Sequence, residues 1–392
     1  MEKINLHIVL NNFINDSRVL KETKSIAESH LFDKVYIAAL LDKGVTEHEI
    51  IDAKREIWRV PLKTRKFPKD IFSQTIKYIE WMLKIFFRYK NENVKVVHCH
   101  DLSALPIGVL FKIIKRTKLI YDAHELETEV DELTGLRKKI SVLWENFLIR
   151  YANQIIVVSD SIEEWYKKKY SLKNIKVIKN VPCKIRDSNS NMNILKEKFN
   201  IRADDMLFIF QGSISVGNGI QAVLNTFSKV ESKKHIVFMG YGPLVEQVKD
   251  YERRFLNIHY QSAVKPEDIL RYTQCADIGI SFIENTCLSY FFSLPNKVFE
   301  YILSGLPIIV SNLPEVKKIV FEYNCGWVVE IKENDLLRLI ESITYEDIKG
   351  KKENVIKCKN NFGWDKEEVK LLKTYYNLTN NKLSMDSEIC VE

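Results

Sequence analysis

Short apolar runs rich in β-branched residues recur along most of this chain, and they constrain its fold more than any other feature. Helical patterns such as DSRVLKETKSIAES separate most of the runs. Strands that alternate with helices favour parallel sheets covered on both faces. The sequence therefore predicts an α/β protein with two doubly wound sheets. The predicted strands are INLHIVL (4–10), KVYIAAL (34–40), EIWRVPL (56–62), VKVVHCH (94–100), KLIYDAH (118–124), QIIVVSD (154–160) and IKVIKN (175–180) in the first half, and MLFIFQG (206–212), KHIVFMG (234–240), IHYQSAV (258–264), IGISFI (278–283), LPIIVSN (306–312) and GWVVEI (326–331) in the second.

Length and a change of composition divide the chain into parts. Its 392 residues exceed one ordinary core. A polar stretch, KIRDSNSNMN (184–193), interrupts the strand series, and an amphipathic pattern follows the last predicted strand. We predict a first domain over 1–183, a linker over 184–205 and a second domain over 206–360. A terminal helix over 361–378 and a tail over 379–392 follow.

Composition and cysteine spacing limit the classes of protein. Hydrophobic residues make up 46% of the chain and charged residues 28%, which is typical of soluble globular proteins. No apolar run reaches the ~18 residues of a membrane span, and MEKINLHIVLNN reads as a first strand, not a leader. The seven scattered cysteines favour a reducing, cytoplasmic setting and no metal site. Along HCHD, alternation places His98 and His100 on one face of a strand and Cys99 on the other.

Polar residues crowd at the ends of the predicted strands. Parallel sheets bind ligands outside the carboxyl ends of their strands, so two facing sheets would place the site in the cleft between the domains. Polar residues also simply stop strands, but HCHD and YDAHE directly follow apolar runs and favour function. The candidate lining is Asn11, Asn12, Asp16, His98, His100, Asp101, Asp122, His124, Glu125, Ser159, Gly212, Ser213, Gly240, Gly242, Ser262 and 284–297.

The stretch PNKVFEYILSGLP (295–307) separates into two faces when wound as a helix at about 100° per residue. Pro295 suits the first turn, and Gly305 suits the left-handed stop. A cation, a carboxylate and an amide near a helix N-terminus suit a ligand with phosphates and hydroxyls. The plainer interpretation is a surface helix with a Lys–Glu pair. The polar arc holds Asn296, Lys297, Glu300, Tyr301 and Ser304, and the opposite arc holds Val298, Phe299, Ile302 and Leu303.

The stretch 63–90 is both basic and apolar. It carries eight Lys or Arg residues against Asp70 and Glu80, beside a broad apolar stripe. A basic amphipathic helix can lie on an anionic membrane surface. It can equally cover a core with a solvated basic face, and both interpretations stay open. No nucleic-acid-binding motif accompanies the basic residues, which disfavours nucleic acid as a partner.

Taken together, the motifs resemble the nucleotide-sugar-dependent glycosyltransferases of the GT-B fold, specifically glycosyltransferase family 4, group 1. The most specific match is SLPNKVFEYILSGLPIIVSN, which resembles a variant signature PxKxxEYxxxGxP. The resemblance implies two Rossmann-like domains facing across a cleft, with the acceptor on the first, the nucleotide sugar on the second, and a terminal helix that crosses back. The other motifs are DSRVLKET, VVHCHDLSALPIG, KLIYDAHE, ANQIIVVSDSIEEW, IKVIKNVP, FQGSISVGNGIQAVL, FMGYGPL, CADIGISF and FGWDKEEVKLLKTYY.

The resemblance assigns roles by position. It implies that Glu300 holds the donor ribose, because a carboxylate can accept both bonds of a vicinal diol. It implies that backbone at Ala263 and Val264 reads the base, and that the turn at Gly212 lets backbone approach the diphosphate. The expected donor-binding residues are Gly212, Ser213, Gly240, Gly242, Ala263, Val264, Ser293, Leu294, Pro295, Asn296, Lys297 and Glu300.

On the acceptor side, the resemblance places His124 near the transferred sugar. His98, His100 and Asp101 match a neighbouring signature that supports the site from behind, and Asn12 matches the first loop. We expect His124, Glu300 and Lys297 to carry the chemistry. The expected acceptor-side residues are Asn12, Asp16, His100, Asp101, Asp122, His124 and Glu125.

Three departures from the family pattern matter. Phe292 stands where the first glutamate of the family's pair would be, so backbone N–H groups of 289–295 are expected to hold the sugar instead. The first turn of the second domain has Asn218 and no cation, so Lys297 is expected to neutralise the diphosphate, helped by the helix N-terminus. The first loop, NNFINDSRV, lacks the family's glycines.

The resemblance implies transfer of a sugar from a nucleotide diphosphate donor to an acceptor hydroxyl, retaining and without metal or other cofactor. The leaving phosphate would accept the acceptor's proton, while His124 positions the sugar or stabilises charge. The expected acceptor is a lipid-linked saccharide of a bacterial surface polymer such as capsule or lipopolysaccharide. The expected location is the cytoplasm, at the inner face of the cell membrane.

Three rivals remain. A nucleotide-sugar 2-epimerase shares the two-domain fold. A non-catalytic, glycosyltransferase-like binding or scaffold protein would fit the missing glutamate and missing cations. A dinucleotide-dependent dehydrogenase is disfavoured, because no GxGxxG follows the first strand.

Overall fold

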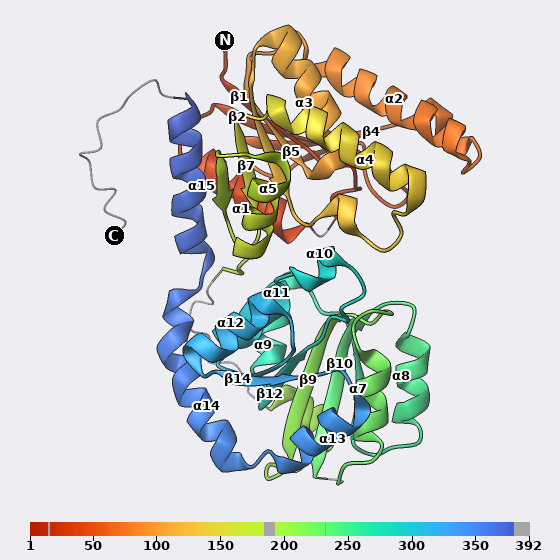
Figure 1. The fold of residues 1–392 in the computed structure, drawn as a ribbon, viewed down its shortest axis with the longest axis vertical. Helices are drawn as coiled ribbons and strands as arrows, with labels where there is room; N and C mark the ends of the chain where they lie inside the picture. Colours follow the sequence, from red (N-terminus) through yellow and green to blue (C-terminus); the bar gives the residue numbers. More distant parts are fainter. Residues whose placement is uncertain (15, 184–192, 232, 380–392) are drawn as a thin grey trace.

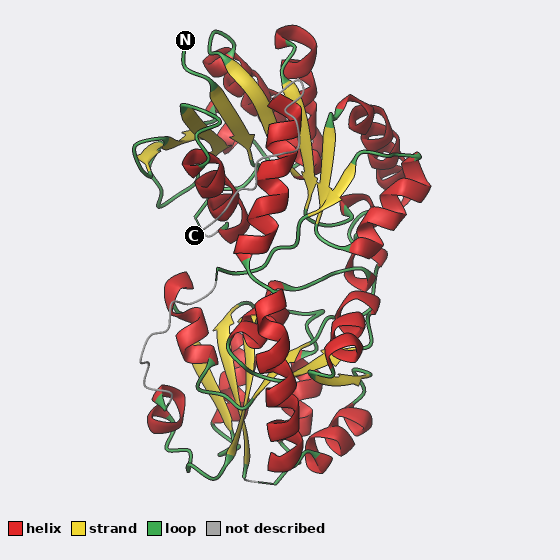
Figure 2. Ribbon diagram, turned by 90° about the vertical axis from the view of Figure 1, so that its left-hand side faces the viewer, coloured by secondary structure: helices red, strands yellow, loops and turns green. Residues whose placement is uncertain are grey.

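The computed structural model describes residues 1–14, 16–183, 193–231 and 233–379. Two α/β domains lie one above the other (Figures 1 and 2). Each is built on a parallel sheet with helices on both faces, which confirms the predicted fold class. Residues 184–192 of the predicted linker and residues 380–392 of the predicted tail lie outside the described residues.

The first domain contains one eight-stranded sheet. All seven predicted runs form strands, and the sheet adds a short edge strand that pairs antiparallel to its neighbour. The order across the sheet is β3-β4-β2-β1-β5-β6-β7-β8. The strands are β1 (Ile4–Ile8), β2 (Lys34–Leu40), β3 (His48–Ile50), β4 (Arg55–Val60), β5 (Val94–His100), β6 (Lys118–Ala123), β7 (Gln154–Val157) and β8 (Ile175–Val177).

Two helical layers cover this sheet. One face packs against α2 to α5, and the other against α1 and the C-terminal helix. Alternation along β5 puts Cys99 in the first core and His98 beneath the second layer, as the sequence predicts. The helices are α1 (Ser17–Glu28), α2 (Ile71–Tyr89), α3 (Asp101–Lys115), α4 (Gly135–Leu148) and α5 (Asp160–Tyr170), with short 3-10 turns η1 (Lys63–Lys66), η2 (Glu127–Glu129) and η3 (Ile149–Tyr151).

The second domain contains a six-stranded, wholly parallel sheet. Its order is β11-β10-β9-β12-β13-β14, and all six predicted runs form its strands. The strands are β9 (Met206–Ser213), β10 (Lys234–Tyr241), β11 (Ile258–Ser262), β12 (Ile278–Ser281), β13 (Ile308–Ser311) and β14 (Gly326–Val329). The helices are α6 (Ile194–Lys198), α7 (Ile220–Phe227), α8 (Val245–Glu252), α9 (Ile269–Thr273), α10 (Leu288–Phe291), α11 (Asn296–Leu303), α12 (Pro314–Tyr323), α13 (Glu333–Ser342) and α14 (Tyr345–Cys358), with η4 (Pro266–Asp268) and η5 (Lys359–Asn361).

The predicted helix of the PNKVFEYILSGLP stretch is α11. Pro295 is its N-cap residue, and Gly305 has a φ of +81°, the left-handed conformation that follows a helix end. The buried face contains Val298, Phe299 and Ile302. Burial of this face against the sheet fixes the direction in which the polar face points.

The C-terminal helix α15 (Trp364–Thr379) crosses back to the first domain and packs against α1 (Figure 1). Trp364 Nε1 donates to Ser25 Oγ at 2.9 Å, and the backbone N–H of Lys179 donates to Glu367 at 2.9 Å. Tyr375 is fully buried under the first-domain sheet. The chain therefore joins the two domains twice.

The described part of the predicted linker packs on the second domain. Leu195 and Ile201 are buried in its core. Within the described ranges, no helix is long and apolar enough to cross a membrane.

The basic, apolar stretch forms η1 and then α2, a helix with two apolar faces. Trp81, Ile85 and Tyr89 are buried against the sheet. Ile79, Leu83 and Phe87 lie on another face and are 45–59% exposed. The helix therefore covers the core and also presents an apolar surface that no other part of the described chain covers.

Candidate active site

Two cavities adjoin each other at the carboxyl ends of the two sheets. Asn296, at the start of α11, lines both. The interdomain cavity has a volume of about 420 Å³ and is lined by Asn11, Asn12, Ile14, Asp16, Ser17, Arg18, His124, Val158, Asn180, Leu294 and Asn296. The second-domain cavity has a volume of about 390 Å³ and is lined by Gln211, Gly212, Ser213, Asn218, Met239, Gly240, Tyr241, Ala263, Val264, Ile269, Ile283, Pro295, Asn296, Lys297 and Glu300.

Lys297 is a cation without a fixed partner in the second-domain cavity. Its Nζ lies 4.3 Å from the centroid of the Phe210 ring and has no hydrogen bond or ion pair within the described part of the chain. Burial lowers the pKa of Lys297 to about 8, although Glu300 opposes this shift. An amine that is partly desolvated and unpaired is suited to bind an anion.

Glu300 is held in place by a short chain of polar side chains. Gln211 donates its amide N–H to the Glu300 carboxylate, and Thr273 Oγ1 donates to Gln211 Oε1 at 2.6 Å. Burial raises the pKa of Glu300, while Gln211, Lys21 and Lys297 oppose that shift. Gln211 and Thr273 were not expected from sequence. Gln211 lies in the FQGSISVGNGIQAVL motif but inside the predicted strand, and Thr273 belongs to no recognised motif.

Three residues that sequence places on the ligand side lie elsewhere. Tyr301 is fully buried, and its hydroxyl donates to Ile280 O and accepts from Gln211 N, so it ties α11 to the sheet. Ser293 donates to Tyr290 O and lines neither cavity. Gly242 packs against the backbone of Ile214, where a Cβ would come within 2.3 Å of the carbonyl oxygen.

The loop before α11 also differs from expectation. The N–H groups of Phe291, Phe292 and Ser293 already donate within α10 and its turn. Phe292 lies against the first domain, where its carbonyl accepts from Ser159 Oγ at 3.1 Å. The carboxylate near the entry to α7 is Glu284, which accepts from the Gly219 N–H at 3.3 Å.

In the interdomain cavity, Asn12, Asp16 and His124 line the surface as the sequence places them. Asp16 also caps α1 by accepting from Val19 N at 3.1 Å. Of the other expected acceptor-side residues, Asp101 and Glu125 are partly or well exposed but outside the lining, and His100 and Asp122 lie behind the surface. His100 and Asp122 are 2% and 0% exposed, and neither is among the lining residues.

Arg18 organises the buried side of this corner. Its guanidinium donates to both oxygens of Asp122, at 2.9 and 2.8 Å, and to Ile178 O at 2.9 Å. Its Nε also lies 3.0 Å from Glu22. Arg18 and His124 hold the pKa of Asp122 well below its usual range, against the opposing effect of burial.

His124 lies between two carboxylates. Its Nε2 is 3.2 Å from Asp122, its Nδ1 is 3.5 Å from Asp101, and its backbone N–H donates to Asp101 at 3.1 Å. Burial by itself would lower the pKa of His124, but Asp101 and Asp122 outweigh it and raise the pKa to about 10. Asp101 holds this position with a φ of +66°, an unfavourable conformation for a residue with a Cβ. The two carboxylates therefore favour the protonated form of His124.

Five buried residues behind the cavity were not expected from sequence: Asn5, His7, Arg18, Glu22 and Tyr375. The signal available was alternation. Asn5 and His7 are polar residues two apart in an apolar strand, as His98 and His100 are. Tyr375 lies in the FGWDKEEVKLLKTYY motif, but nothing in that motif indicates a contact with the histidines of the first sheet.

The buried histidines and carboxylates are of the types that bind metals, and two groups of them cluster: His7, Glu22, His98 and His100, and His100, Asp122 and His124. In the second group, Arg18 occupies both oxygens of Asp122. In the first, His7 and His100 bond to each other, and Arg18 pairs with Glu22 at 3.0 Å. His98 Nε2 and both carboxylate oxygens of Glu22 have no hydrogen-bond partner in the described chain.

Side chains from both domains meet beside the cavities. Glu125 accepts from Ser289 Oγ at 3.3 Å, which moves it from the cavity lining to a contact between the domains. Ser161 N donates to Glu315 at 2.8 Å, and Lys318 pairs with Asp160 at 2.7 Å. These contacts hold the strand ends of the two sheets toward each other.

Comparison with known families gives two matches that together span most of the chain. The model described as "Glycosyltransferase Family 4" matches residues 32–181, and the model described as "Glycosyl transferases group 1" matches residues 205–344. The boundary between the two matches falls at the boundary between the two domains.

Curated relatives are similar over most of their length. A chitobiosyldiphosphodolichol beta-mannosyltransferase of Kluyveromyces lactis is 21% identical over 350 residues, which cover 80% of this chain and 76% of that protein. The protein of the same description from Candida albicans is 24% identical and covers 74% of this chain and 69% of that protein.

Solved structures share the two-domain arrangement. A sucrose-phosphate synthase from Thermosynechococcus elongatus superimposes with a TM-score of 0.75 at 14% identity, covering 96% of this chain and 99% of that one. HepE of Anabaena, solved with UDP and glucose, gives 0.72 at 13% identity and covers 96% and 100%. WaaG, a glycosyltransferase involved in lipopolysaccharide biosynthesis, gives 0.67 at 12% identity and covers 96% and 100%. These likenesses show the fold.

Proposed function

Because the chain belongs to the GT-B-fold glycosyltransferases of family 4, group 1, we propose that it transfers a sugar from a nucleotide diphosphate donor to a hydroxyl of a lipid-linked saccharide. One observation carries this proposal: the second-domain cavity, with an unpaired cation and an oriented carboxylate, opens beside the polar interdomain cavity. Asn296 lines both. A donor bound in the second-domain cavity would present its sugar to the interdomain cavity.

The donor is held by complementary charges. Lys297 and the first turn of α11 meet the diphosphate, and Glu300, oriented by Gln211, accepts from the ribose hydroxyls. Ala263 and Val264 line the same cavity and place backbone against the base. Lys297 gains a partner only when the diphosphate is bound, which makes it the principal contributor to donor affinity.

His124 acts as a cation in this mechanism. Both of its ring nitrogens face carboxylates, so it has no free lone pair to take a proton from the acceptor. The leaving phosphate takes that proton, and His124 stabilises negative charge on the donor as the glycosidic bond breaks. This arrangement suits transfer with retention and without a metal.

The acceptor proposal rests on the relatives and on one surface. The curated relatives are named for a chitobiosyl group on a diphosphodolichol, and we propose a saccharide on a diphospholipid here. Those relatives are yeast proteins and lend no support to the bacterial capsule or lipopolysaccharide expected from sequence. The type of polymer is therefore left to the acceptor panel below.

The first domain presents an apolar surface that suits a membrane-held acceptor. Helix α3 contacts both α2 and α4, and the three carry half of the large apolar side chains that are exposed in the described chain. They also carry eight Lys or Arg residues against three acidic ones. The exposed apolar residues are Ile71, Phe72, Ile79, Leu83, Phe87, Ile113, Ile114, Leu136, Ile140, Leu143, Trp144 and Phe147.

Helix α4 is anchored from within. The carboxylate of Glu145, which is fully buried, accepts from the hydroxyls of Tyr121, Tyr166, Tyr170 and Thr128 at 2.6–3.1 Å. Its opposite face, with Leu143 at 68% exposure, has no partner in the described chain. Exposed apolar side chains on helices that also carry an excess of Lys and Arg suit the interface of an anionic bilayer. We propose the cytoplasmic face of a membrane as the working location.

The function is tested with a panel of radiolabelled nucleotide sugars and with chitobiosyl diphospholipids built on dolichol and on undecaprenol. We expect transfer from one donor, with loss of at least about 100-fold in Glu300→Ala, because two charge-assisted bonds to the ribose disappear. Turnover of the donor to an epimer without acceptor would support the epimerase instead. No turnover, and no thermal protection by nucleotide, would support the binding protein.

Stereochemistry and metal dependence are measured on the same product. We expect the anomeric configuration of the donor to be retained by NMR and activity to survive chelation by EDTA. The relatives' names specify a β linkage, so a β product from an α-linked donor would show inversion and would contradict the retaining proposal.

Membrane binding is tested by co-sedimentation with anionic phospholipid vesicles. We expect Leu143→Glu combined with Phe147→Glu to weaken binding about tenfold or more, because charged groups replace the inserted apolar ones. Phe321→Glu is the matched control, since Phe321 is equally exposed, at 67%, on α12 of the second domain. Equal binding of both variants would contradict the proposal that this surface binds the membrane. Loss of self-association with unchanged vesicle binding would identify it as a contact between copies.

A further inference from the structure

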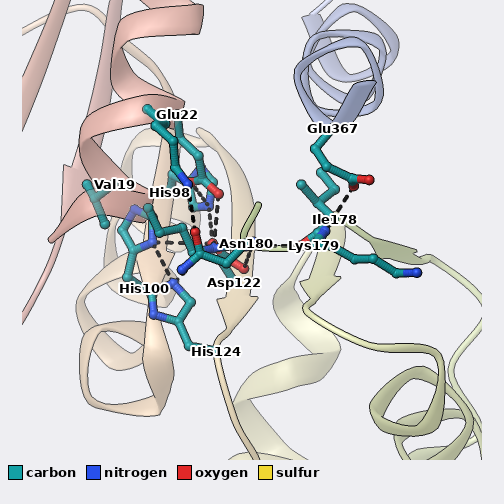
Figure 3. A network of polar contacts seen from close by, with 12 residues as sticks. Val19, Glu22, His98, His100, Asp122, His124, Ile178, Lys179, Asn180 and Glu367 are labelled. Carbon is teal, nitrogen blue, oxygen red and sulfur yellow. Dashed lines mark hydrogen bonds and ion pairs between the residues drawn. The ribbon is translucent and has the colours of Figure 1, made fainter. Parts of the chain in front are cut away.

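A stripe of polar side chains crosses three neighbouring strands beneath α1 and α15. Each strand contributes a pair two residues apart: Asn5 and His7 on β1, His98 and His100 on β5, and Asp122 and His124 at the end of β6. Figure 3 shows His98, His100 and His124 gathered around Asp122, and of these four only His124 lines the interdomain cavity. The proposed mechanism uses His124 and leaves the residues behind it without a role.

These residues form one continuous chain of hydrogen bonds. Asn5 Oδ1 lies 2.7 Å from His7 Nε2, His7 Nδ1 lies 2.9 Å from His100 Nε2, and His100 Nδ1 lies 3.2 Å from His124 Nε2. We call Asn5, His7, His100 and His124 the histidine ladder. Apart from His124, its members are 0–2% exposed.

The ring protons along the ladder are assigned from this pattern. Asn5 Nδ2 donates to Val96 O at 3.2 Å, which leaves Asn5 Oδ1 to accept from His7 Nε2–H. Burial lowers the pKa values of His7 and His100, so both rings are neutral. His7 Nδ1 then accepts from His100 Nε2–H. His100 Nδ1, which also lies 3.4 Å from Asp122 Oδ2, accepts from His124 Nε2–H. Every ring proton therefore points the same way.

We propose that Asn5 is a positioning residue that, through His7 and His100, holds His124 doubly protonated at the edge of the interdomain cavity. Asn5 acts by setting the direction in which the ring protons of the ladder point. If its acceptor is lost, His7 can carry its proton on Nδ1, which reverses His100 and places an N–H against His124 Nε2–H. That reversed ladder favours loss of the His124 proton.

Other charged groups around His124 set the background for this effect. Asp101 and Asp122 face its two ring nitrogens, and Arg18 lies behind Asp122. Glu22 and Glu125 are near enough to interact through charge. These groups stay in place when Asn5 is changed, so a shift in His124 isolates the contribution of the ladder.

The first test uses the unmodified protein. With histidine ring nitrogens labelled with ¹⁵N, we expect His7 and His100 to be neutral with the proton on Nε2, and His124 to be protonated on both nitrogens at neutral pH. Single His→Gln variants assign the signals. A proton on Nδ1 of neutral His7 or His100, or a neutral His124, would overturn the proposal. This readout does not depend on the proposed function.

The second test is the pH profile of kcat at saturating donor. For Asn5→Leu we expect the alkaline limb to move to lower pH by about one unit. Asn5→Asp, which keeps an acceptor toward His7, should restore its position. Ser25→Ala is the matched control, because it removes a buried hydrogen bond, from Trp364 Nε1 at 2.9 Å, between the same two helices but outside the ladder. An unmoved limb in Asn5→Leu, or an equal shift in Ser25→Ala, would refute the proposal even where sugar transfer itself is intact.

Discussion

The charged groups of the two cavities differ in whether they are paired. At the interdomain cavity, Arg18 and His124 are both paired with the buried carboxylate of Asp122, at 2.8–3.2 Å. In the second-domain cavity, Lys297 has no ionic partner in the described chain. A paired cation supports the fold, whereas an unpaired, partly buried one costs stability and is free to bind an anion. The difference separates a rigid corner from a binding site.

The largest expected effect is on stability. Arg18→Leu leaves Asp122 and Glu22 buried with only His124 to balance them, so we expect a loss of about 3–5 kcal/mol in the free energy of unfolding. Lys297→Leu removes a desolvated amine without a partner and should stay within about 1 kcal/mol of the parent. Urea unfolding of both variants tests the contrast. Equal losses would show that Lys297 is also a structural cation.

The next effect is on donor affinity. Lys297→Ala should weaken nucleotide diphosphate binding by about 10- to 100-fold, because a charged hydrogen bond is worth about 1.5–3 kcal/mol. Isothermal titration of the nucleoside diphosphate measures it, with the nucleoside monophosphate as control. A negligible change would place the phosphate contact elsewhere, with the entry to α7 as the next candidate.

The pH dependence of donor binding sharpens the same point. Because burial lowers the pKa of Lys297 to about 8, the free amine loses its proton as pH rises through 8. The dissociation constant should then increase by up to about tenfold per pH unit. Lys297→Arg should extend tight binding well past that pH, because a guanidinium stays protonated. Binding that is flat from pH 7 to 9.5 in the parent would contradict the role of Lys297.

The smallest effect on donor affinity is expected from Thr273, which does not line the cavity but orients Gln211. Thr273→Val removes the 2.6 Å bond that orients Gln211, and Gln211 in turn orients Glu300. We expect a loss of about 1 kcal/mol, or roughly fivefold in donor affinity, with the fold intact. Saturation binding and thermal unfolding measured together distinguish this from a general loss of stability.

Part of the second-domain cavity could be predicted from sequence. Lys297 and Glu300 were found because helical winding puts them on one face of α11, and both line the second-domain cavity. Tyr301 shares that arc but is buried. Winding gives the direction of a side chain, and only the packed sheet shows that a ring at this angle reaches β12. Phe292 likewise was judged by its spacing from Glu300, although its loop turns toward the first domain.

By itself, the sequence determined the local periods and the strand ends. These are set by residues close together in the chain, and from them follow the two parallel sheets, the domain order and the cleft lined by His124, Asn12 and Glu300. Tertiary structure alone decided which polar groups meet. Tyr375 reaches His98 across 277 positions, and Arg18 reaches Asp122 across 104. Contacts at such separations depend on how whole layers of helices and strands pack, so no local sequence pattern predicts them. The charge state of His124 depends on these contacts.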